Sequence, residues 1–263
     1  MDLKIKGKKG VVAAASSGLG RAVAESLAEE GVDLVICSRN REKIKKAAEE
    51  ISVKYKANVF PVSCDVTIEG DLLKLKEEVE KKLGTCHILF ANAGGPPPGG
   101  VEDFSTEDLN NALKLNLFST VNLVKTFLPY MRRELWGRIL ASTSISVKQP
   151  IPSLALSNIS RAGVVSYIKT LSDQVGKFNI TANVIAPGYI QTGRVVQILN
   201  NKAKKEGKSY EEVKGELKKA IPVNKIGSPE EFGAFSAFLL SDLASYITGD
   251  TILIDGGMYR GTM

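Results

Sequence analysis

The chain has 263 residues, of which 43% are hydrophobic, 24% are charged and 6% are aromatic, a composition typical of a globular protein with a full core and not of a disordered or collagen-like chain. Its 35 Lys and Arg against 29 Asp and Glu give a net charge of +6, but no zinc finger, helix-turn-helix or aromatic RNA platform is apparent, so we expect no nucleic-acid partner. The longest apolar stretches, such as residues 235–240, are far shorter than the roughly 18 residues of a membrane span, and residues 1–15 are too weakly apolar for a secretory signal. We therefore expect a cytoplasmic protein with no membrane partner.

Short apolar runs alternate with helix-period stretches along the chain. The runs predict seven buried strands, at residues 10–15, 32–37, 58–63, 87–91, 138–141, 181–186 and 251–254. The stretches between them predict helices at residues 19–30, 41–55, 68–83, 106–135, 158–176 and 229–242. Because each strand is apolar throughout, we predict an α/β fold, a Rossmann-type doubly wound parallel sheet of seven strands with helices on both faces.

One segment, residues 194–220, is too long and too charged for an ordinary connection between the sixth strand and the last helix. Within it, residues 202–219 hold seven Lys and four Glu that interleave at helical spacing, as on a solvated helix face. We interpret the segment as a helical lid with no core of its own.

The cysteines and the single histidine indicate packing and not chemistry. Cys37, Cys64 and Cys86 are odd in number and widely spaced, which favours reduced thiols over disulfides or a metal site. His87 has only Cys86 beside it and begins an apolar run, so we predict a structural role for it and no catalytic pair based on histidine. No metal is expected.

A glycine-containing turn, residues 13–20 with the sequence AAASSGLG, follows the first strand and leads into a helix. Such turns let backbone amides approach a pyrophosphate at the positive end of the helix. The signal is weak alone, but other residues follow at fixed places near strand ends or in helices: Asp65 and Val66, then Asn92, Ala93 and Gly94, then Asn116, Ser144, Pro187, Gly188 and Thr192.

A second loop at a strand end, residues 94–100, reads Gly-Gly-Pro-Pro-Pro-Gly-Gly. Ligands bind at the carboxyl ends of strands in such sheets, so the loop could be a rigid wall of a pocket. A stiff connecting loop is an equally good interpretation.

With these motifs in this order, the whole chain resembles the short-chain dehydrogenase/reductase family, from the first strand to the closing Ile254-Asp255-Gly256-Gly257. Within that family it is most similar to the 3-oxoacyl-[acyl-carrier-protein] reductases. The resemblance implies one dinucleotide-binding domain over residues 1–263, a lid at residues 194–220 that closes over the substrate, a small-molecule or acyl-thioester substrate, and a homo-oligomer, either tetramer or dimer.

The end of the second strand usually selects the cofactor in this family. An acidic residue there would bind the ribose 2′-hydroxyl of NAD(H), but this chain has Ser38-Arg39-Asn40. Because a guanidinium matches a 2′-phosphate bidentately, we favour NADP(H) over NAD(H). The alternative is that Arg39 only stacks on the adenine.

The resemblance also implies contacts for other residues. Asp65 would face the adenine, Asn92 and Gly94 would pack on the adenosine ribose, and Thr192 would hold the nicotinamide carboxamide. The other positions that it assigns to the cofactor are Ala14, Ser16, Ser17, Gly18, Leu19, Gly20, Val66, Ala93, Arg161, Pro187, Gly188 and Ile190.

The chain departs from the family pattern at the glycine turn, where Ala13-Ala14 replaces the usual Thr-Gly. If this turn needs a positive φ, alanine costs roughly 1 kcal/mol, and otherwise it costs nothing. We expect cofactor binding to be retained.

A second departure concerns the catalytic residues. Family enzymes use a tyrosine that delivers the proton, a lysine four residues later and a serine 13 residues earlier. Ser144 fits the serine, but Ser157 stands at the tyrosine position and Arg161 at the lysine position, and the nearest tyrosine, Tyr167, lies ten residues further on. A serine hydroxyl ends ~4 Å short of a phenol's position and is far less acidic than a phenol of pKa ~10, while arginine cannot supply a proton near neutral pH. Losing a positioned general acid typically costs roughly 10²- to 10⁴-fold in rate.

Three hypotheses follow for these residues. In the first, a water bridged by Ser157, Ser144 and the site behind Asn116 fills the vacated volume, and the protein is a slow or specialised NADPH-dependent reductase. In the second, another donor serves, either Lys148 with a pKa depressed by burial or nearby cations, or Tyr189 as a weaker candidate. The alternative for Lys148 is an exposed loop lysine.

In the third, the protein binds the cofactor without turnover, as a sensor or a partner subunit. We predict an NADP(H)-dependent oxidoreductase that reduces a carbonyl compound, either a ketone or a 3-oxoacyl thioester. The non-catalytic, cofactor-binding protein is the alternative.

Overall fold

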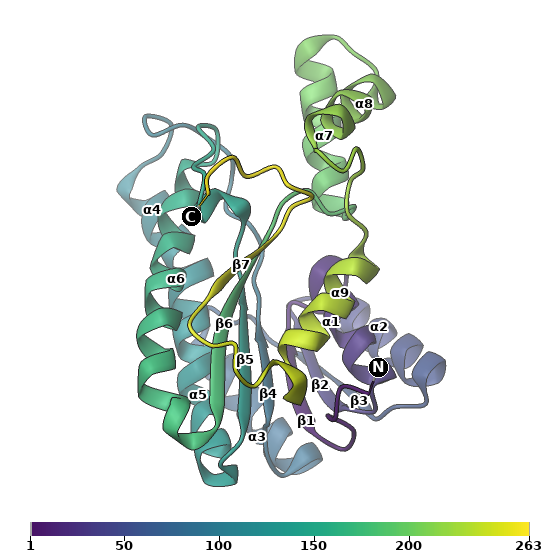
Figure 1. Ribbon diagram of the computed structural model, residues 1–263, viewed down its shortest axis with the longest axis vertical. Coiled ribbons are helices and arrows are strands. Elements are labelled where there is room, and N and C mark those ends of the chain that lie inside the picture. The colour runs from purple at the N-terminus through teal and green to yellow at the C-terminus, as the bar shows by residue number, and fades with distance from the viewer. Residues whose placement is uncertain (1, 263) are drawn as a thin grey trace.

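The sheet is the predicted Rossmann-type sheet. The computed structural model of the chain describes residues 2–262. Seven strands lie in this part of the chain: β1 (Lys9–Ala13), β2 (Asp33–Ser38), β3 (Val59–Ser63), β4 (Ile88–Ala91), β5 (Gly137–Ser142), β6 (Ile180–Pro187) and β7 (Thr251–Ile254). They form one parallel sheet in the order β3-β2-β1-β4-β5-β6-β7 (Figure 1). The order reverses between β1 and β4, and ligands bind at the carboxyl ends of strands beside such a reversal.

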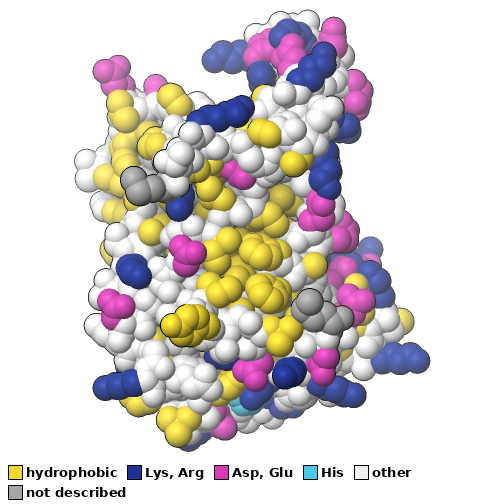
Figure 2. Space-filling view, viewed as in Figure 1, with side chains coloured by type: hydrophobic (Ala, Val, Ile, Leu, Met, Phe, Trp, Pro, Cys, Tyr) yellow, Lys and Arg dark blue, Asp and Glu magenta, His cyan; other side chains and the backbone are white. Residues whose placement is uncertain are grey.

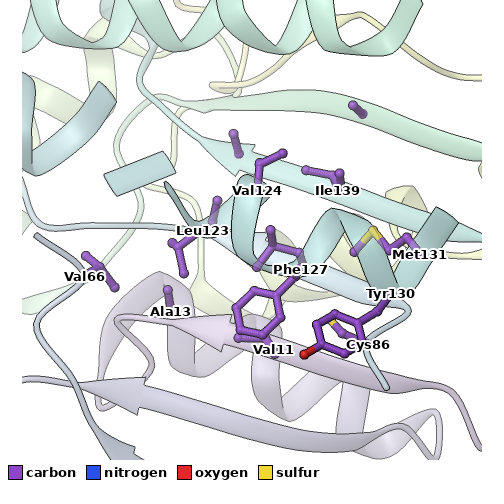
Figure 3. Close-up of a cluster of buried hydrophobic side chains, with 14 of the residues drawn as sticks. Val11, Ala13, Val66, Cys86, Leu123, Val124, Phe127, Tyr130, Met131 and Ile139 are labelled. Carbon is purple, nitrogen blue, oxygen red and sulfur yellow. The ribbon is translucent and has the colours of Figure 1, made fainter. Parts of the chain in front are cut away.

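Helices cover both faces of the sheet, as predicted. They are α1 (Gly18–Glu29), α2 (Arg41–Tyr55), α3 (Glu69–Leu83), α4 (Thr106–Leu113), α5 (Ser119–Glu134), α6 (Ala155–Val175), α7 (Gly193–Glu206), α8 (Tyr210–Ala220) and α9 (Pro229–Leu239). Successive residues of a strand point to opposite faces, so Val11 packs with α3, α5 and α6, whereas Val12 packs with α1, α2 and α9. Figure 3 shows Leu123 and Phe127 of α5 beside Ala13 and Val11 of β1.

The predicted helix at residues 106–135 is interrupted. A single π-helical turn at residues 114–118 separates α4 from α5 and contains the buried Asn116. Two hydroxyl groups of the next turn, those of Ser119 and Thr120, donate hydrogen bonds to the Asn116 carbonyl oxygen at 3.3 and 2.8 Å. Such π-turns are frequent at functional sites, and this one presents Asn116 to the loop after β4.

The segment predicted as a lid forms two helices, α7 and α8, which project from the body of the molecule beyond the carboxyl ends of the strands (Figure 1). Its charges are interleaved as predicted, and Lys208 pairs with Glu206 at 3.0 Å and with Glu216 at 2.6 Å. The expectation that the segment has no core of its own is wrong. Four buried side chains form a separate small cluster there: Val195, Leu199, Ala203 and Val213. Three of them recur every four residues of α7 and so lie on one helix face.

The cysteines and His87 have the structural roles predicted for them. All three cysteines are buried free thiols. The His87 Nδ1 accepts a hydrogen bond from the Lys9 amide at 3.0 Å, and the ring packs edge-on against Trp136 at 6.0 Å between centroids. Across residues 2–262, the structure shows no group of three or more His, Cys, Asp or Glu side chains arranged to bind a metal. No helix in the same part of the chain is both long and apolar enough to cross a bilayer.

Candidate functional site

The residues singled out in the sequence come together at the carboxyl ends of the central strands. Gly94 follows β4, Ser144 follows β5, and Gly188 follows β6. The loop of residues 94–100 is held against the start of α6, because Gly99 donates to the Ser153 carbonyl at 2.8 Å and accepts from the Ala155 amide at 3.0 Å. The proline-rich loop is therefore a fixed wall beside this edge of the sheet.

The turn after β1 has the geometry of an anion cradle. Ala14 has φ +52° and Gly18 has φ +61°, so both lie in the left-handed region. A Cβ atom at Gly20 would lie 2.4 Å from the Ala14 carbonyl oxygen, so only glycine fits there. The N-cap residue of α1, Ser17, makes no side-chain capping hydrogen bond, which leaves the first amides of the helix available to a phosphate. The preceding Ala15 is buried, while Ser16 and Leu19 are half-buried.

The end of β2 presents an uncompensated cation. Arg39 is exposed, and no carboxylate of residues 2–262 lies within 4.0 Å of its guanidinium. Its backbone is held in place, because Ser63 Oγ donates to the Arg39 carbonyl at 3.2 Å and Asn40 caps α2 by accepting from the Lys43 amide at 2.8 Å. Ser38 Oγ donates to the Asn40 carbonyl at 3.4 Å. A fixed backbone and an unpaired guanidinium fit a phosphate ligand.

Asp65 holds the loop after β3. Its Oδ1 accepts hydrogen bonds from the Thr67 amide at 3.0 Å and the Thr67 hydroxyl at 2.7 Å, and the side chain is half-buried. Val66 packs into the core, and after β4 the side chains of Asn92 and Ala93 are half-buried while Gly94 is exposed. These residues lie at the carboxyl ends of β3 and β4, where the resemblance assigns the adenosine.

The loop after β6 reaches across to the glycine turn. Pro187 and Ile190 are buried, and Thr192 is the N-cap residue of α7. A Cβ atom at Gly18 would lie 3.5 Å from Thr192 Cγ2, so the two segments face each other at van der Waals distance. The base of α7 is thereby placed beside the phosphate cradle.

Arg161 is the centre of the site. Its guanidinium donates from Nη1 to the Ser142 and Thr143 carbonyl oxygens at 3.1 and 3.2 Å, and from Nη2 to the Gly94 carbonyl oxygen at 3.4 Å. Its Nε donates to Ser157 Oγ at 3.2 Å, one turn earlier on α6. The residue is only 8% exposed, and burial, followed by the charge of Arg194, lowers the pKa of Arg161 to about 10. The group is thus charged at neutral pH.

Asn116 joins the same network from the π-helical turn. Its Nδ2 donates to the Gly94 carbonyl at 3.0 Å, and its Oδ1 accepts from Ser160 Oγ at 3.0 Å. The Gly94 carbonyl therefore receives hydrogen bonds from both Asn116 and Arg161. The sequence analysis did not identify Ser160 as a site residue. Its contact with Asn116 depends on the register of α6, which also brings Ser157 and Arg161 together.

The other candidate proton donors lie in less suitable surroundings. Ser144 is half-buried, and its Oγ accepts from the Ser146 amide at 3.2 Å, which leaves its hydroxyl proton available. Lys148 is exposed, so the burial that the second hypothesis requires is not found. Tyr189 packs against the small cluster of the lid, and burial raises its pKa. Tyr167 packs against the main core, and burial raises its pKa as well.

A second arginine, Arg194, was missed in the sequence. It lies in the first turn of α7, and its Nη2 donates to the Pro96 carbonyl oxygen at 3.3 Å across the loop of residues 94–100. Its only sequence signal is its place at the start of the predicted lid. The arrangement as a whole offers a charged guanidinium and serine hydroxyls, which can stabilise negative charge on an oxygen atom, but no phenol.

Comparison with known proteins gives consistent matches over the full length. A sequence model described as Enoyl-(Acyl carrier protein) reductase matches residues 13–259. The 3-oxoacyl-[acyl-carrier-protein] reductase FabG of Aquifex aeolicus is 32% identical over 98% of this chain and 100% of its own. The NADPH-dependent reductase BacG of Bacillus subtilis is 31% identical over 95% of this chain and 96% of its own. The structure of L-sorbose reductase from Gluconobacter frateurii, complexed with NADPH and L-sorbose, superposes with a TM-score of 0.95 at 30% identity, covering 99% of this chain and 100% of that one.

The left-handed conformation of Ala14 leads to a stability prediction. We expect Ala14→Gly to stabilise the fold by roughly 1 kcal/mol, because glycine adopts φ +52° without the steric penalty of a Cβ atom. Ala22→Gly in the interior of α1 is the matched control and should destabilise by about 1 kcal/mol. Denaturant unfolding measures both, and a loss of stability in Ala14→Gly equal to that in the control would contradict the strain.

Proposed function

The chain belongs to the short-chain dehydrogenase/reductase family, and from this membership we propose that it is an NADP(H)-dependent reductase of a carbonyl compound, either a ketone or a 3-oxoacyl thioester. The observation that carries the proposal is the hydrogen-bonded set of Asn116, Ser157, Ser160 and Arg161 at the ends of β4 and β5. The positive charge of Arg161, held beside the Ser157 hydroxyl, is suited to stabilise negative charge that develops on a carbonyl oxygen.

The cofactor preference is supported by the surroundings of Arg39. The amides at the start of α1 would hold the pyrophosphate, and Arg39 would pair with a 2′-phosphate, which only NADP(H) carries. BacG of Bacillus subtilis is an NADPH-dependent reductase, and the L-sorbose reductase structure is a complex with NADPH, which supports this choice. When bound, NADPH would supply the hydride.

Residues of the chain would stabilise the negative charge that develops on the carbonyl oxygen of the substrate. The hydroxyls of Ser144 and Ser157 can donate to that oxygen, and the positive charge of Arg161 stabilises it from behind Ser157. Four of the five N–H groups of Arg161 donate hydrogen bonds to Ser142, Thr143, Gly94 and Ser157, so the guanidinium is held in place. It would therefore act on the carbonyl oxygen mainly through its positive charge. The proton would reach the oxygen from water beside the two serines, as in the first of the three hypotheses.

Lys148 is the weaker donor, since its side chain is exposed to solvent. A second function, cofactor binding without turnover, is favoured by one observation: Tyr167, the tyrosine nearest to Ser157 in the sequence, and Tyr189, the weaker candidate donor, pack against the main core and the lid cluster. The experiments below separate the two functions.

Self-association is part of the proposal. β7 is an edge strand whose four residues are all half-buried, and apolar side chains gather over β7 and α9 on the face seen in Figure 2. Partly buried residues of this patch are Phe235, Phe238, Ile252 and Ile254. An open apolar edge of this kind favours a homo-oligomer, either dimer or tetramer.

Arg39 gives a test of cofactor choice. We expect Arg39→Ala to weaken NADPH binding about 10- to 100-fold and to leave NADH binding nearly unchanged, because only NADPH offers a phosphate to the lost guanidinium. Fluorescence titration of both cofactors measures this. Lys45→Ala, which removes a cation from the exposed face of α2, is the control. An equal effect on NADPH and NADH would show that Arg39 only stacks on the adenine.

Turnover is tested by stopped-flow oxidation of NADPH against a panel of ketones and 3-oxoacyl thioesters. We expect the wild type to oxidise NADPH with at least one of them, and Ser157→Tyr/Arg161→Lys to be faster by up to roughly 10²- to 10⁴-fold, the usual contribution of a positioned general acid. Lys148→Ala should match the wild type. If the wild type oxidises nothing while the double variant does, the protein binds its cofactor without turnover.

A further inference from the structure

Residues 256–262, called the strap below, cross from the last strand of the sheet to the loop after β5. The strap starts at the edge of the sheet, where the Gly188 amide after β6 donates to the Ile254 carbonyl oxygen of β7 at 3.0 Å. Further along, the Arg260 amide donates to Gln149 Oε1 at 3.3 Å. Because β6 lies between β5 and β7, the strap must pass the carboxyl end of β6, and Figure 1 shows it as the yellow trace that runs from β7 toward α4.

Gln149, where the strap is held, belongs to the same short turn as Ser144. The Ser144 carbonyl oxygen accepts from the Val147 amide at 3.1 Å. The next carbonyl, that of Ile145, accepts from the Gln149 amide at 3.0 Å. These bonds make residues 144–149 one compact turn, so the strap comes close to the serine that would contact the substrate.

The first half of the strap is fixed against the base of the lid. The Asp255 carboxylate accepts from the Gly257 amide at 2.9 Å and from the Tyr259 amide at 2.8 Å. Gly256 has φ +67°, and its carbonyl oxygen accepts from the Val223 amide, just beyond α8, at 3.3 Å. A Cβ atom at Gly256 would lie 2.8 Å from Val223 Cγ2, so glycine allows this close approach. The strap therefore joins the base of the lid to the turn after β5.

Tyr259 is the largest side chain of the strap. It is half-buried, whereas Arg260 and Gly261 are exposed. Its hydroxyl lies close to Gly261, only 2.2 Å from the position of a Cβ atom there, so the ring lies along the strap. Asp255 holds the Tyr259 amide and Gln149 holds the next amide, which keeps the ring in place.

We propose that the strap is the outer wall of the substrate pocket, and that the Tyr259 ring limits the length of the chain on the substrate carbonyl. This inference rests on the proposed function, in which Ser144 donates to the carbonyl oxygen, and it narrows the substrate class to short ketones or short 3-oxoacyl compounds. The lid and the strap then enclose the substrate from two sides.

The kinetic test compares the symmetrical ketones 3-pentanone and 5-nonanone, and a short with a long 3-oxoacyl thioester. Symmetrical ketones carry the same chain on both sides, so the result does not depend on which way they bind. We expect the wild type to prefer the shorter compounds. Tyr259→Ala should raise kcat/KM for the longer compound relative to the shorter one by about 10-fold or more, because loss of the ring enlarges the pocket.

Three further variants complete this comparison. Tyr259→Phe keeps the ring and should behave as the wild type. Tyr246→Ala, which removes a fully exposed tyrosine from the loop before β7, is the matched control and should also behave as the wild type. Gln149→Ala releases the strap and should shift the preference in the same direction as Tyr259→Ala. Since Gln149 is exposed, this variant carries the test if Tyr259→Ala does not fold.

A labelling experiment that needs neither substrate nor cofactor separates the wall from the proposed function. Ser144→Cys places a thiol in the site of a chain whose own three cysteines are buried. In this background, Tyr259→Ala and Gln149→Ala should each speed labelling by fluorescein maleimide about 10-fold and labelling by N-ethylmaleimide less than about 3-fold, because thiol labelling depends on access and only the larger reagent is held back.

The outcomes are distinguishable. If labelling changes as expected but no variant reduces any carbonyl compound, the wall stands and the reductase does not. If carbonyl compounds are reduced but Tyr259→Ala has the same preference as Tyr246→Ala, or Tyr259→Phe shifts the preference as far as Tyr259→Ala, the inference is wrong while the reductase stands. If neither variant changes labelling at Ser144→Cys, the strap does not cover this position, and the inference is wrong whatever the turnover.

Discussion

The Gly94 carbonyl oxygen is the acceptor on which the site depends. It receives one hydrogen bond from Asn116 in the π-helical turn and another from Arg161 on α6. Arg161 in turn bonds to Ser142 and Thr143, so one guanidinium joins the ends of β4 and β5 to the helix that covers them. The position of Ser157 follows from this, because its hydroxyl accepts from the same guanidinium.

The electrostatic consequence is a cation that is buried but not neutralised. Carbonyl oxygens satisfy its hydrogen bonds but do not cancel its charge, so the field of Arg161 remains available at the site. Arg194 adds a second positive charge from the lid. A site of this kind favours negative charge that develops on a carbonyl oxygen. Under the proposed function, the guanidinium field would take over part of the role that a phenol and an ammonium share in the family pattern.

Much of the fold could be predicted because it depends on local pattern. Buried parallel strands are apolar throughout, so the run that ends at Ala91 could be located to within a residue of β4. The interruption of the helix at residues 114–118 could not be predicted, because it is tied to the Asn116 amide and its contact with Gly94, 22 residues away. The small core of the lid was missed although its signal, Val195 and Leu199 at helical spacing, was present.

The residues of the candidate site could be proposed from the sequence, but their contacts could not. Sequence resemblance placed Ser157 and Arg161 together, but the acceptors of Arg161 are backbone carbonyls, which no side-chain pattern reveals. Arg194 belongs to no motif, and only the folded chain brings it to Pro96. For Ala14, the cost of replacing the usual glycine depended on φ, and the value of +52° shows that the alanine is strained.

The most direct measurement of the central claim is ¹⁵N NMR of the arginine side chains. We predict that the Arg161 guanidinium gives separate Nη signals and an Nε proton that exchanges slowly with water, because its donors are held by Ser157 and three backbone carbonyls. Arg39, which is exposed, should give averaged and rapidly exchanging signals in the same spectrum. If Arg161 rotates and exchanges as freely as Arg39, the guanidinium is not fixed at the strand ends and cannot organise the site.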